Sequence, residues 1–150
     1  MNTLNSIKIR GPIHRVFEFA WRVEDWPSLL PHYRRVSVIS DSEESRIVAM
    51  HCVRDFGPIL WPCQWVARQV VLPDEWTIHF VHLAGPARGM KVEWKLQADG
   101  ETVHATISHQ LIHRLGPAYS DRIIGPLFVS AIASKTLSTL KTLVEAEALR

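Results

Sequence analysis

The side chains of this sequence that could carry chemistry are two histidines and one arginine on segments that otherwise look buried. His82 and His109 each alternate with apolar residues along a predicted strand, which places them on its inward face. A neutral imidazole there can orient a ligand hydroxyl or carbonyl, or move a proton. The competing interpretation is a core histidine held by one hydrogen bond. Arg54 shares a face with apolar residues and needs an anionic partner or a water-filled rim.

The spacing of the histidines argues against a metal centre. His79 and His82 are three residues apart on a strand and so point to opposite faces. His109 and His113 share a face, but at roughly 3.3 Å per residue they lie about 13 Å apart, too far to share one ion. The sequence also lacks a glycine-rich phosphate loop and the patterns GxSxG and HExxH. We expect no metal and no cofactor, and spacing assigns no catalytic residue.

The two cysteines, Cys52 and Cys63, are equidistant from a predicted turn at Gly57-Pro58. Equal spacing predicts that they face each other across a hairpin. They form no CxxC motif, and two cysteines cannot build a disulfide scaffold. In a reducing compartment we expect two free buried thiols.

The elements that position these side chains follow from the periodicity of the sequence. Leu4–Arg10 alternates and predicts a strand, and helical spacing within Ile13–Leu30 predicts two short helices. From Tyr33 to Arg114 the period is two, and short turns divide the segment into six antiparallel strands. From about Tyr119 an apolar stripe predicts one long helix. We therefore expect an α+β fold in which a seven-stranded curved antiparallel sheet wraps around the C-terminal helix and leaves a cavity between them.

Length and composition restrict the class of protein. The chain has 150 residues, of which 47% are hydrophobic and 21% charged, with a net charge of +2. These values exclude disorder and predict a single domain over residues 1–150. Scattered lysine and arginine argue against nucleic-acid binding, and no uninterrupted apolar run reaches the roughly 18–20 residues of a membrane span. With no secretory signal at the start, we expect a cytoplasmic protein without stable membrane insertion, and homodimerisation stays open.

Three segments carry a resemblance to a known family. They are Val23–Val36, which contains Glu-Asp-Trp-Pro, and the shorter runs Gly89–Trp94 and Thr136–Lys141. All three resemble polyketide cyclase/dehydrase-type proteins of the START and birch-pollen-allergen-like superfamily, which has the helix-grip fold. The resemblance implies that a hydrophobic molecule such as a lipid, polyketide or quinone lies between the sheet and the long helix. It leaves the reaction open, because only some members are enzymes.

Strand alternation and this resemblance together select candidate ligand-binding residues. The opposite face of the strand Ile59–Leu72 fits nearly as well and remains an alternative. Inward aromatic and methionine side chains can also be plain core, but six tryptophans in so short a chain favour stacking on a flat ligand. The candidates are Trp26, Tyr33, Met50, Arg54, Trp65, Gln69, Phe80, His82, Met90, Trp94 and His109.

One position departs from the cyclase pattern. In polyketide aromatase/cyclases a pocket arginine follows the tryptophan of this strand by four residues, and here Gln69 stands four residues after Trp65. Tyr33 matches the pocket tyrosine of the family. Because glutamine cannot stabilise an enolate as a cation does, Arg54 on the neighbouring strand would have to take that role.

Three functions are consistent with these observations. The first is a binding or carrier protein for a flat hydrophobic molecule, and Leu30-Pro31, similar to the coenzyme-Q-binding family, makes a quinone or isoprenoid a candidate. The second is a cyclase/dehydrase-type enzyme in which pocket tyrosine, histidine or arginine side chains move protons. The third is an interaction module with a vestigial cavity. Whether the chain is an enzyme stays open.

Overall fold

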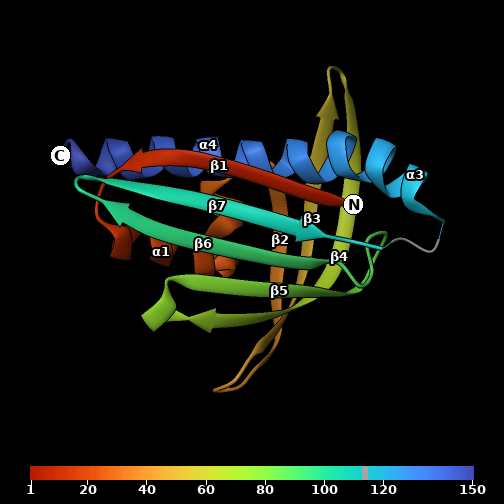
Figure 1. The fold of residues 1–150 in the computed structure, drawn as a ribbon, viewed down its shortest axis with the longest axis horizontal. Coiled ribbons are helices and arrows are strands. Elements are labelled where there is room, and N and C mark those ends of the chain that lie inside the picture. Colours follow the sequence, from red (N-terminus) through yellow and green to blue (C-terminus); the bar gives the residue numbers. More distant parts are fainter. Residues whose placement is uncertain (113–114) are drawn as a thin grey trace.

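A seven-stranded antiparallel sheet forms the body of the computed structural model, which describes residues 1–112 and 115–150 (Figure 1). The strand order is β1-β7-β6-β5-β4-β3-β2, so the first two strands of the chain form the two edges. The strands are β1 (Asn2–Arg10), β2 (Tyr33–Asp41), β3 (Arg46–Phe56), β4 (Ile59–Leu72), β5 (Thr77–Ala84), β6 (Lys91–Asp99) and β7 (Thr102–Gln110).

Helical elements follow β1 and end the chain. The first group is α1 (Ile13–Trp21), η1 (Val23–Asp25) and α2 (Trp26–Leu29), and a short turn η2 (Pro73–Glu75) joins β4 to β5. The C-terminal helix comprises α3 (Pro117–Tyr119), η3 (Ser120–Val129) and α4 (Ser130–Ala148). The predicted order of one strand, two short helices, six strands and a long helix is confirmed, and the fold is the helix-grip fold. The last strand ends at Gln110, and the expectations for His113 and Arg114 lie outside the described residues.

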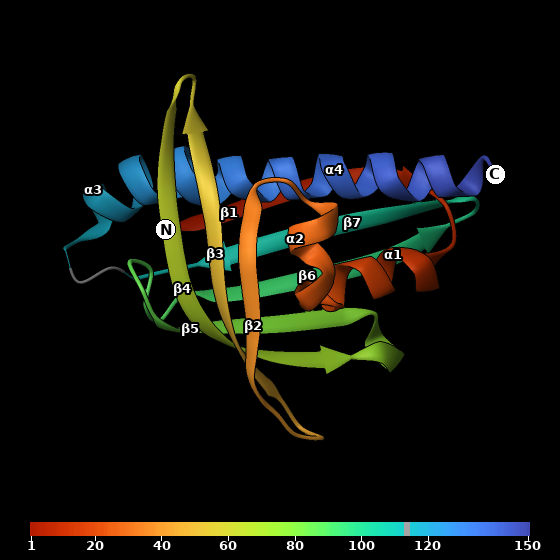
Figure 2. The ribbon, with the colours of Figure 1, turned by 180° about the vertical axis from the view of Figure 1, so that it is seen from behind.

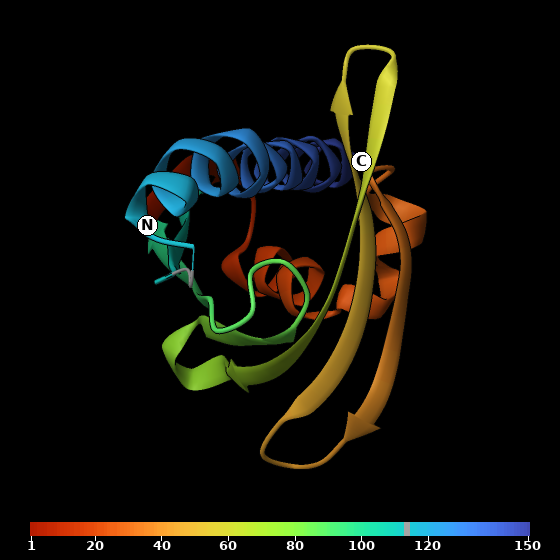
Figure 3. The same cartoon turned by 90° about the vertical axis from the view of Figure 1, so that its right-hand side faces the viewer.

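Sheet curvature places the long helix across the concave face (Figure 3). Even-numbered residues of β3 and odd-numbered residues of β4 face inward, as Met50 and Ala67 are both buried. The opposite inward face, which alternation within Ile59–Leu72 also allowed, is therefore excluded. The inward faces predicted for the last three strands are also correct, because Phe80, Trp94 and His109 are buried there.

The long helix changes its hydrogen-bonding pattern near Pro126. The segment η3 is a π-helix, and at its end the Ser130 N–H donates to the Gly125 carbonyl, five residues earlier. Proline has no N–H to donate, and in an α-helix its ring would clash with the carbonyl four residues before it. The wider π-helical turn accommodates the Pro126 ring where the long helix crosses the open end of the curved sheet.

An apolar stripe and a polar edge dock α4 onto the sheet. Ala133, Leu137, Leu140 and Val144 are buried on one face of the helix. Where α4 runs beside β1 (Figures 1 and 2), the Asn5 side-chain amide donates to the hydroxyl of Ser134 at 2.9 Å. Burial of the stripe supplies the stabilisation, and the polar contacts set the position of the helix along β1.

The continuous helix Pro117–Ala148 has 32 residues and is the one helix among the described residues that is long and apolar enough to cross a membrane. About a third of its most apolar window, 33%, is buried inside the structure. This finding rests on length and composition only.

Candidate ligand-binding site

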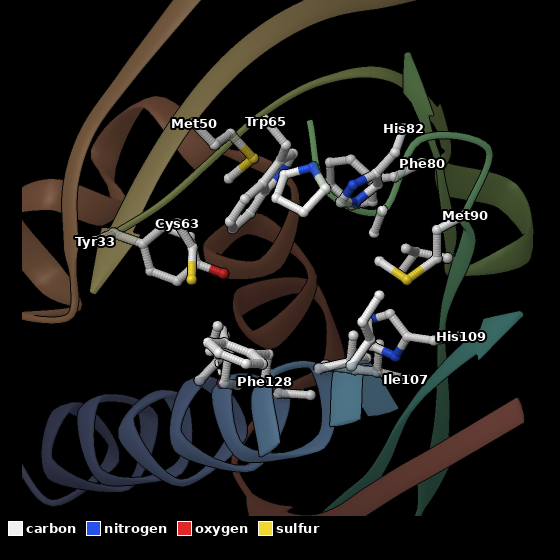
Figure 4. Close-up of a pocket in the computed structure, with 18 of the residues that line it drawn as sticks. Tyr33, Met50, Cys63, Trp65, Phe80, His82, Met90, Ile107, His109 and Phe128 are labelled. Carbon is white, nitrogen blue, oxygen red and sulfur yellow. Dashed lines mark hydrogen bonds between the residues drawn. The ribbon is translucent and has the colours of Figure 1, made fainter. Parts of the chain in front are cut away.

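A cavity of about 490 Å³ lies between the concave face of the sheet and the helical segments η3 and α4 (Figure 4). Its volume is in the range of small-molecule sites, and its walls are predominantly apolar. Side chains therefore do not fill the space between helix and sheet. Nine of the eleven candidate residues line it: Trp26, Tyr33, Met50, Trp65, Phe80, His82, Met90, Trp94 and His109.

Aromatic rings form the wall of the cavity beneath α2. Trp26 lies edge-on to Tyr33, with ring centroids 4.7 Å apart, and 6.1 Å from Trp94. The Trp26 indole N–H already donates to the Phe19 carbonyl at 2.9 Å. The polar edge of this indole is therefore occupied, and the Trp26 ring offers a ligand apolar and π surface only.

Two buried histidines supply the polar groups of the opposite wall. The His82 ring stacks on Trp65, with centroids 5.5 Å apart and planes 15° from parallel. The Nδ1 atoms of His82 and His109 have no hydrogen-bond partner among the described residues. Burial lowers the pKa of His82 to about 4, and burial and the neighbouring His82 lower that of His109 to about 3. Both imidazoles are therefore neutral at pH 7, and each carries one donor and one acceptor nitrogen.

A third histidine, which the sequence reasoning missed, lies beside Tyr33. His32 Nε2 lies 2.9 Å from the Thr136 hydroxyl, which itself donates to the Ile132 carbonyl at 2.8 Å. The hydroxyl must therefore accept from His32, which assigns the proton to Nε2. Burial, with a smaller contribution from Lys135, lowers the His32 pKa to about 4. Only the fold brings this residue, next to Pro31 in a turn, against the long helix.

The Tyr33 hydroxyl is a protonated phenol in this environment. Burial raises its pKa well above the ordinary value, and the nearby thiols of Cys52 and Cys63 raise it further. Figure 4 shows the Tyr33 and Cys63 side chains close together on one side of the cavity. A neutral phenol can donate a hydrogen bond to a ligand, but it cannot serve as a base near pH 7.

Cys52 and Cys63 stand directly opposite each other on β3 and β4, as their equal spacing from the turn predicted. Both are free, Cys52 buried and Cys63 half-buried and lining the cavity. Their hydrogen bond raises the pKa of the Cys52 thiol and lowers that of Cys63, to which Arg54 also contributes. Cys63 therefore places a polarisable thiol on the ligand side of the sheet.

The prediction that Gln69 lines the pocket is wrong in position, although the residue faces inward and is fully buried. Its amide donates to the Trp21 carbonyl at 2.8 Å and accepts from Arg46 Nε at 2.9 Å. Arg46 also pairs with Glu24. Gln69 follows Trp65 by four residues, which span about 13 Å along a strand. It therefore lies outside the cavity wall and beside α1 and η1.

Arg54 does not line the cavity either. Its Nε donates to the Leu127 carbonyl at 2.7 Å, and its guanidinium lies 4.2 Å from the centre of the Phe56 ring. The side chain thus connects the β3–β4 hairpin to η3 at the rim of the cavity. A rim position was one of the two environments that the sequence allowed for this arginine. No lysine, arginine, aspartate or glutamate is among the described residues that line the cavity.

Several lining residues escaped the sequence reasoning because they come from a hairpin tip and the start of the long helix. Trp61 and Phe128 pack edge-on with centroids 6.3 Å apart, and both line the cavity. Ile123 lines it from the same helical segment. Helical periodicity places these residues on a face, but the contact between hairpin and helix is tertiary.

The family model described as polyketide cyclase/dehydrase and lipid transport matches residues 9–128. That match covers most of the chain. The protein belongs to this family. Its members' role in binding hydrophobic ligands or in cyclisation agrees with a large apolar cavity between sheet and helix. No curated protein sequence matches the chain.

Several solved structures share the fold of this chain. The Zhui aromatase/cyclase from Streptomcyes sp. R1128 has 17% identity and a TM-score of 0.79, covering 99% of this chain and 95% of its own. The protein TTHA0849 from Thermus thermophilus has 15% identity and a TM-score of 0.81, covering 98% and 99%. A START superfamily protein from Mycobacterium smegmatis has 7% identity and a TM-score of 0.73, covering 97% of each chain. At these identities the similarity establishes the fold alone.

Proposed function

We propose that this family member binds a flat hydrophobic small molecule that carries a hydroxyl or carbonyl oxygen at one edge. The aromatic wall around Trp26 would stack on the flat part of such a molecule. Burial of apolar ligand surface supplies roughly 25 cal/mol per Å² before the costs of ordering are subtracted. Lipid, quinone and polyketide-like molecules all have the required chemistry.

The observation that carries this proposal is the pair of unpartnered nitrogens on His82 and His109. A buried polar atom without a partner costs about 1–3 kcal/mol, so such atoms usually meet a ligand or water. Both atoms belong to side chains that line the cavity. A neutral imidazole can donate to a ligand carbonyl or accept from a ligand hydroxyl, which orients the bound molecule.

The proposal predicts a polar contribution that can be measured with matched probes. We expect 2,3-dimethyl-1,4-naphthoquinone, whose methyl groups hinder thiol addition, to quench tryptophan fluorescence and to bind more tightly than 2,3-dimethylnaphthalene. His82→Leu and His109→Leu each lower the quinone affinity about tenfold, the value of one buried hydrogen bond. Affinity for the hydrocarbon stays the same.

His79→Leu is the matched control for that measurement, because His79 lies on the same strand as His82 with 42% of its side chain exposed. Native mass spectrometry of freshly purified protein, followed by solvent extraction, identifies any ligand that copurifies. Absence of binding by both probes, together with empty protein in repeated preparations, would rule out the carrier function.

A second candidate is a cyclase/dehydrase-type enzyme, favoured by the family description and by neutral imidazoles that can move protons. Because no cationic side chain is among the described lining residues, stabilisation of an enolate would depend on hydrogen bonds alone. In an enzyme, Tyr33→Phe or His109→Ala abolishes turnover of a polyketide-like substrate with only a modest loss of ligand affinity. Equal loss of turnover and affinity, or no turnover by the wild type, supports the carrier function.

A further inference from the structure

The hairpin that joins β3 and β4 extends beyond the rest of the sheet. Pairing between β2 and β3 ends at Cys52, and pairing between β4 and β5 begins at Val66. The residues beyond these points, 53–62, pair only with each other within the sheet. Figures 1 and 2 show this two-stranded arm projecting past the long helix.

The arm and the start of the long helix present large apolar side chains to solvent. Ile59, Leu60 and Trp61 at the tip are 60%, 57% and 54% exposed, and Ile123 and Leu127 on η3 are 40% and 43% exposed. We call these five residues the mouth patch. Such a concentration of exposed apolar residues in one region is characteristic of an interaction site.

Contacts between hairpin and helix make the mouth patch one surface beside the cavity. Phe128 packs edge-on against Phe56 and Trp61, with centroids 5.6 and 6.3 Å away. Trp61 and Ile123 also line the cavity, so the patch borders its opening. A ligand leaving past these side chains would stay in an apolar environment.

Three arginines lie on the elements that carry the mouth patch or line the cavity beside it. Arg54 and Arg122 flank the patch on the hairpin and the helix, and Arg88 lies in the loop whose neighbours Ala87 and Met90 line the cavity. Neither Arg88 nor Arg122 forms an ion pair with a described carboxylate.

The two acidic residues on these elements are already paired. Asp55 lies 3.5 Å from Arg54 and 3.6 Å from Lys135, and Asp121 lies 3.0 Å from the N-terminal amine. The turns rich in Asp and Glu lie elsewhere: the β2–β3 turn, η2 and the β6–β7 turn are remote from α3 (Figure 1). The opening of the cavity is therefore the basic end of the molecule.

We propose that the mouth patch docks onto the surface of an anionic lipid bilayer, where the hydrophobic ligand enters or leaves the cavity; the transfer step rests on the proposed function. Isoleucine and leucine side chains enter the region below the headgroups, tryptophan favours the interface, and arginines contact lipid phosphates. Peripheral docking of this kind inserts no helix across the membrane.

Charge favours a bilayer over a second copy of the chain. Two copies joined through the mouth patch would add the Arg88 and Arg122 charges of one copy to those of the other, while Asp55 and Asp121 are already paired. Anionic headgroups supply the missing charge. The apolar interior of the bilayer also dissolves the class of ligand that the cavity accommodates.

Vesicle flotation tests the docking without any added ligand. Wild-type protein floats with phosphatidylcholine vesicles that contain about 30% phosphatidylglycerol, and floats much less with pure phosphatidylcholine or at high salt. Ile59→Asp with Leu60→Asp weakens the partitioning by more than about tenfold. Ile39→Asp is the matched control, since Ile39 is 59% exposed on β2 and lies outside the patch.

The arginines are tested separately with Arg88→Gln combined with Arg122→Gln, which weakens partitioning about tenfold, whereas Arg34→Gln with Arg35→Gln on β2 does not. Quenching by the quinone probe in solution reports the proposed function independently, and Ile59→Asp/Leu60→Asp retains it. The docking proposal is overturned if wild-type protein does not float with anionic vesicles, or if Ile59→Asp/Leu60→Asp floats as well as Ile39→Asp. A wild-type dimer that Ile59→Asp/Leu60→Asp converts to monomers also overturns it.

Discussion

Three neutral histidines, His32, His82 and His109, are the chemically distinctive residues of this protein. Burial is the first cause of the lowered pKa at each of them. None of the three has a hydrogen-bond partner at Nδ1 among the described residues, but His32 Nε2 lies against the Thr136 hydroxyl and His32 is outside the cavity lining, whereas His82 and His109 line the cavity. The same residue type thus contacts the long helix at one position and lines the cavity at two others.

Protonation of His82 and His109 couples stability to pH. Their folded pKa values, about 4 and about 3, lie below the ordinary value of 6.5, so the unfolded chain binds more protons in acid. The free energy of unfolding should therefore fall as pH decreases below 6.5, by up to about 1.4 kcal/mol per pH unit for each histidine until its folded pKa is reached.

Denaturant unfolding at about pH 7 and about pH 5 measures this coupling. His82→Gln and His109→Gln each reduce the loss of stability between the two conditions, and His104→Gln on the exposed face of β7 does not. An unchanged pH dependence in both buried-site variants would contradict the assignment of these histidines as buried and neutral.

At the scale of elements, close contacts between strands hold the cavity wall in place. Gly85 follows β5 with φ of +115°, and a Cβ there would lie 2.8 Å from the Gln64 carbonyl oxygen and 3.0 Å from Trp65 Cβ. The backbone of β4 cannot retreat from this contact without moving Trp65 and the His82 ring stacked on it. One glycine therefore determines how closely the β5–β6 loop approaches the cavity.

Gly85→Ala should destabilise the protein and weaken ligand binding together. Gly89→Ala is the control, because Gly89 has φ of +91° in the same loop but nothing within 4 Å of a Cβ. We expect Gly85→Ala to lose about 1–3 kcal/mol more unfolding free energy than Gly89→Ala, the cost of an overpacked contact. Denaturant unfolding and quinone quenching measure the two effects, and equal losses in both variants would assign the whole cost to backbone strain.

At the scale of the whole molecule, the cavity exists because a curved sheet cannot close on a single helix. α4 buries Leu137, Leu140 and Val144 toward its C-terminal end, whereas η3 and the first two turns of α4 border the open space. The protein is thus packed at one end and hollow at the other. Stability and binding should therefore be separable by substitutions along the same helix.

Ala133→Leu tests that separation, because Ala133 is buried and lines the cavity from α4. The larger side chain occupies ligand space, so quinone affinity falls by roughly tenfold, while unfolding free energy stays within about 1 kcal/mol or rises. Ala146→Leu, at an exposed position of the same helix, leaves both unchanged. Strong destabilisation by Ala133→Leu would mean that the helix cannot tolerate the added volume.

The order of elements and the inward face of each strand that lines the cavity could be predicted from periodicity. A period of two places Phe80, Trp94 and His109 on inward faces, because neighbouring side chains on a strand alternate sides. Alternation also identified Gln69 as inward, and it is buried as expected. Periodicity carries no information on where along the strand the cavity ends, which is why Gln69 was placed in the pocket.

Local sequence thus determined which face of each element is apolar, since that property depends only on residue type and the repeat of the backbone. Tertiary structure alone decided which inward residues meet empty space, which meet another helix, and which distant residues share a site. His32 against Thr136, Arg54 against the Leu127 carbonyl, and Phe128 against Trp61 are contacts across long stretches of chain. Such contacts depend on how far the sheet curves and where the helix crosses it, and both are set by packing of the whole chain.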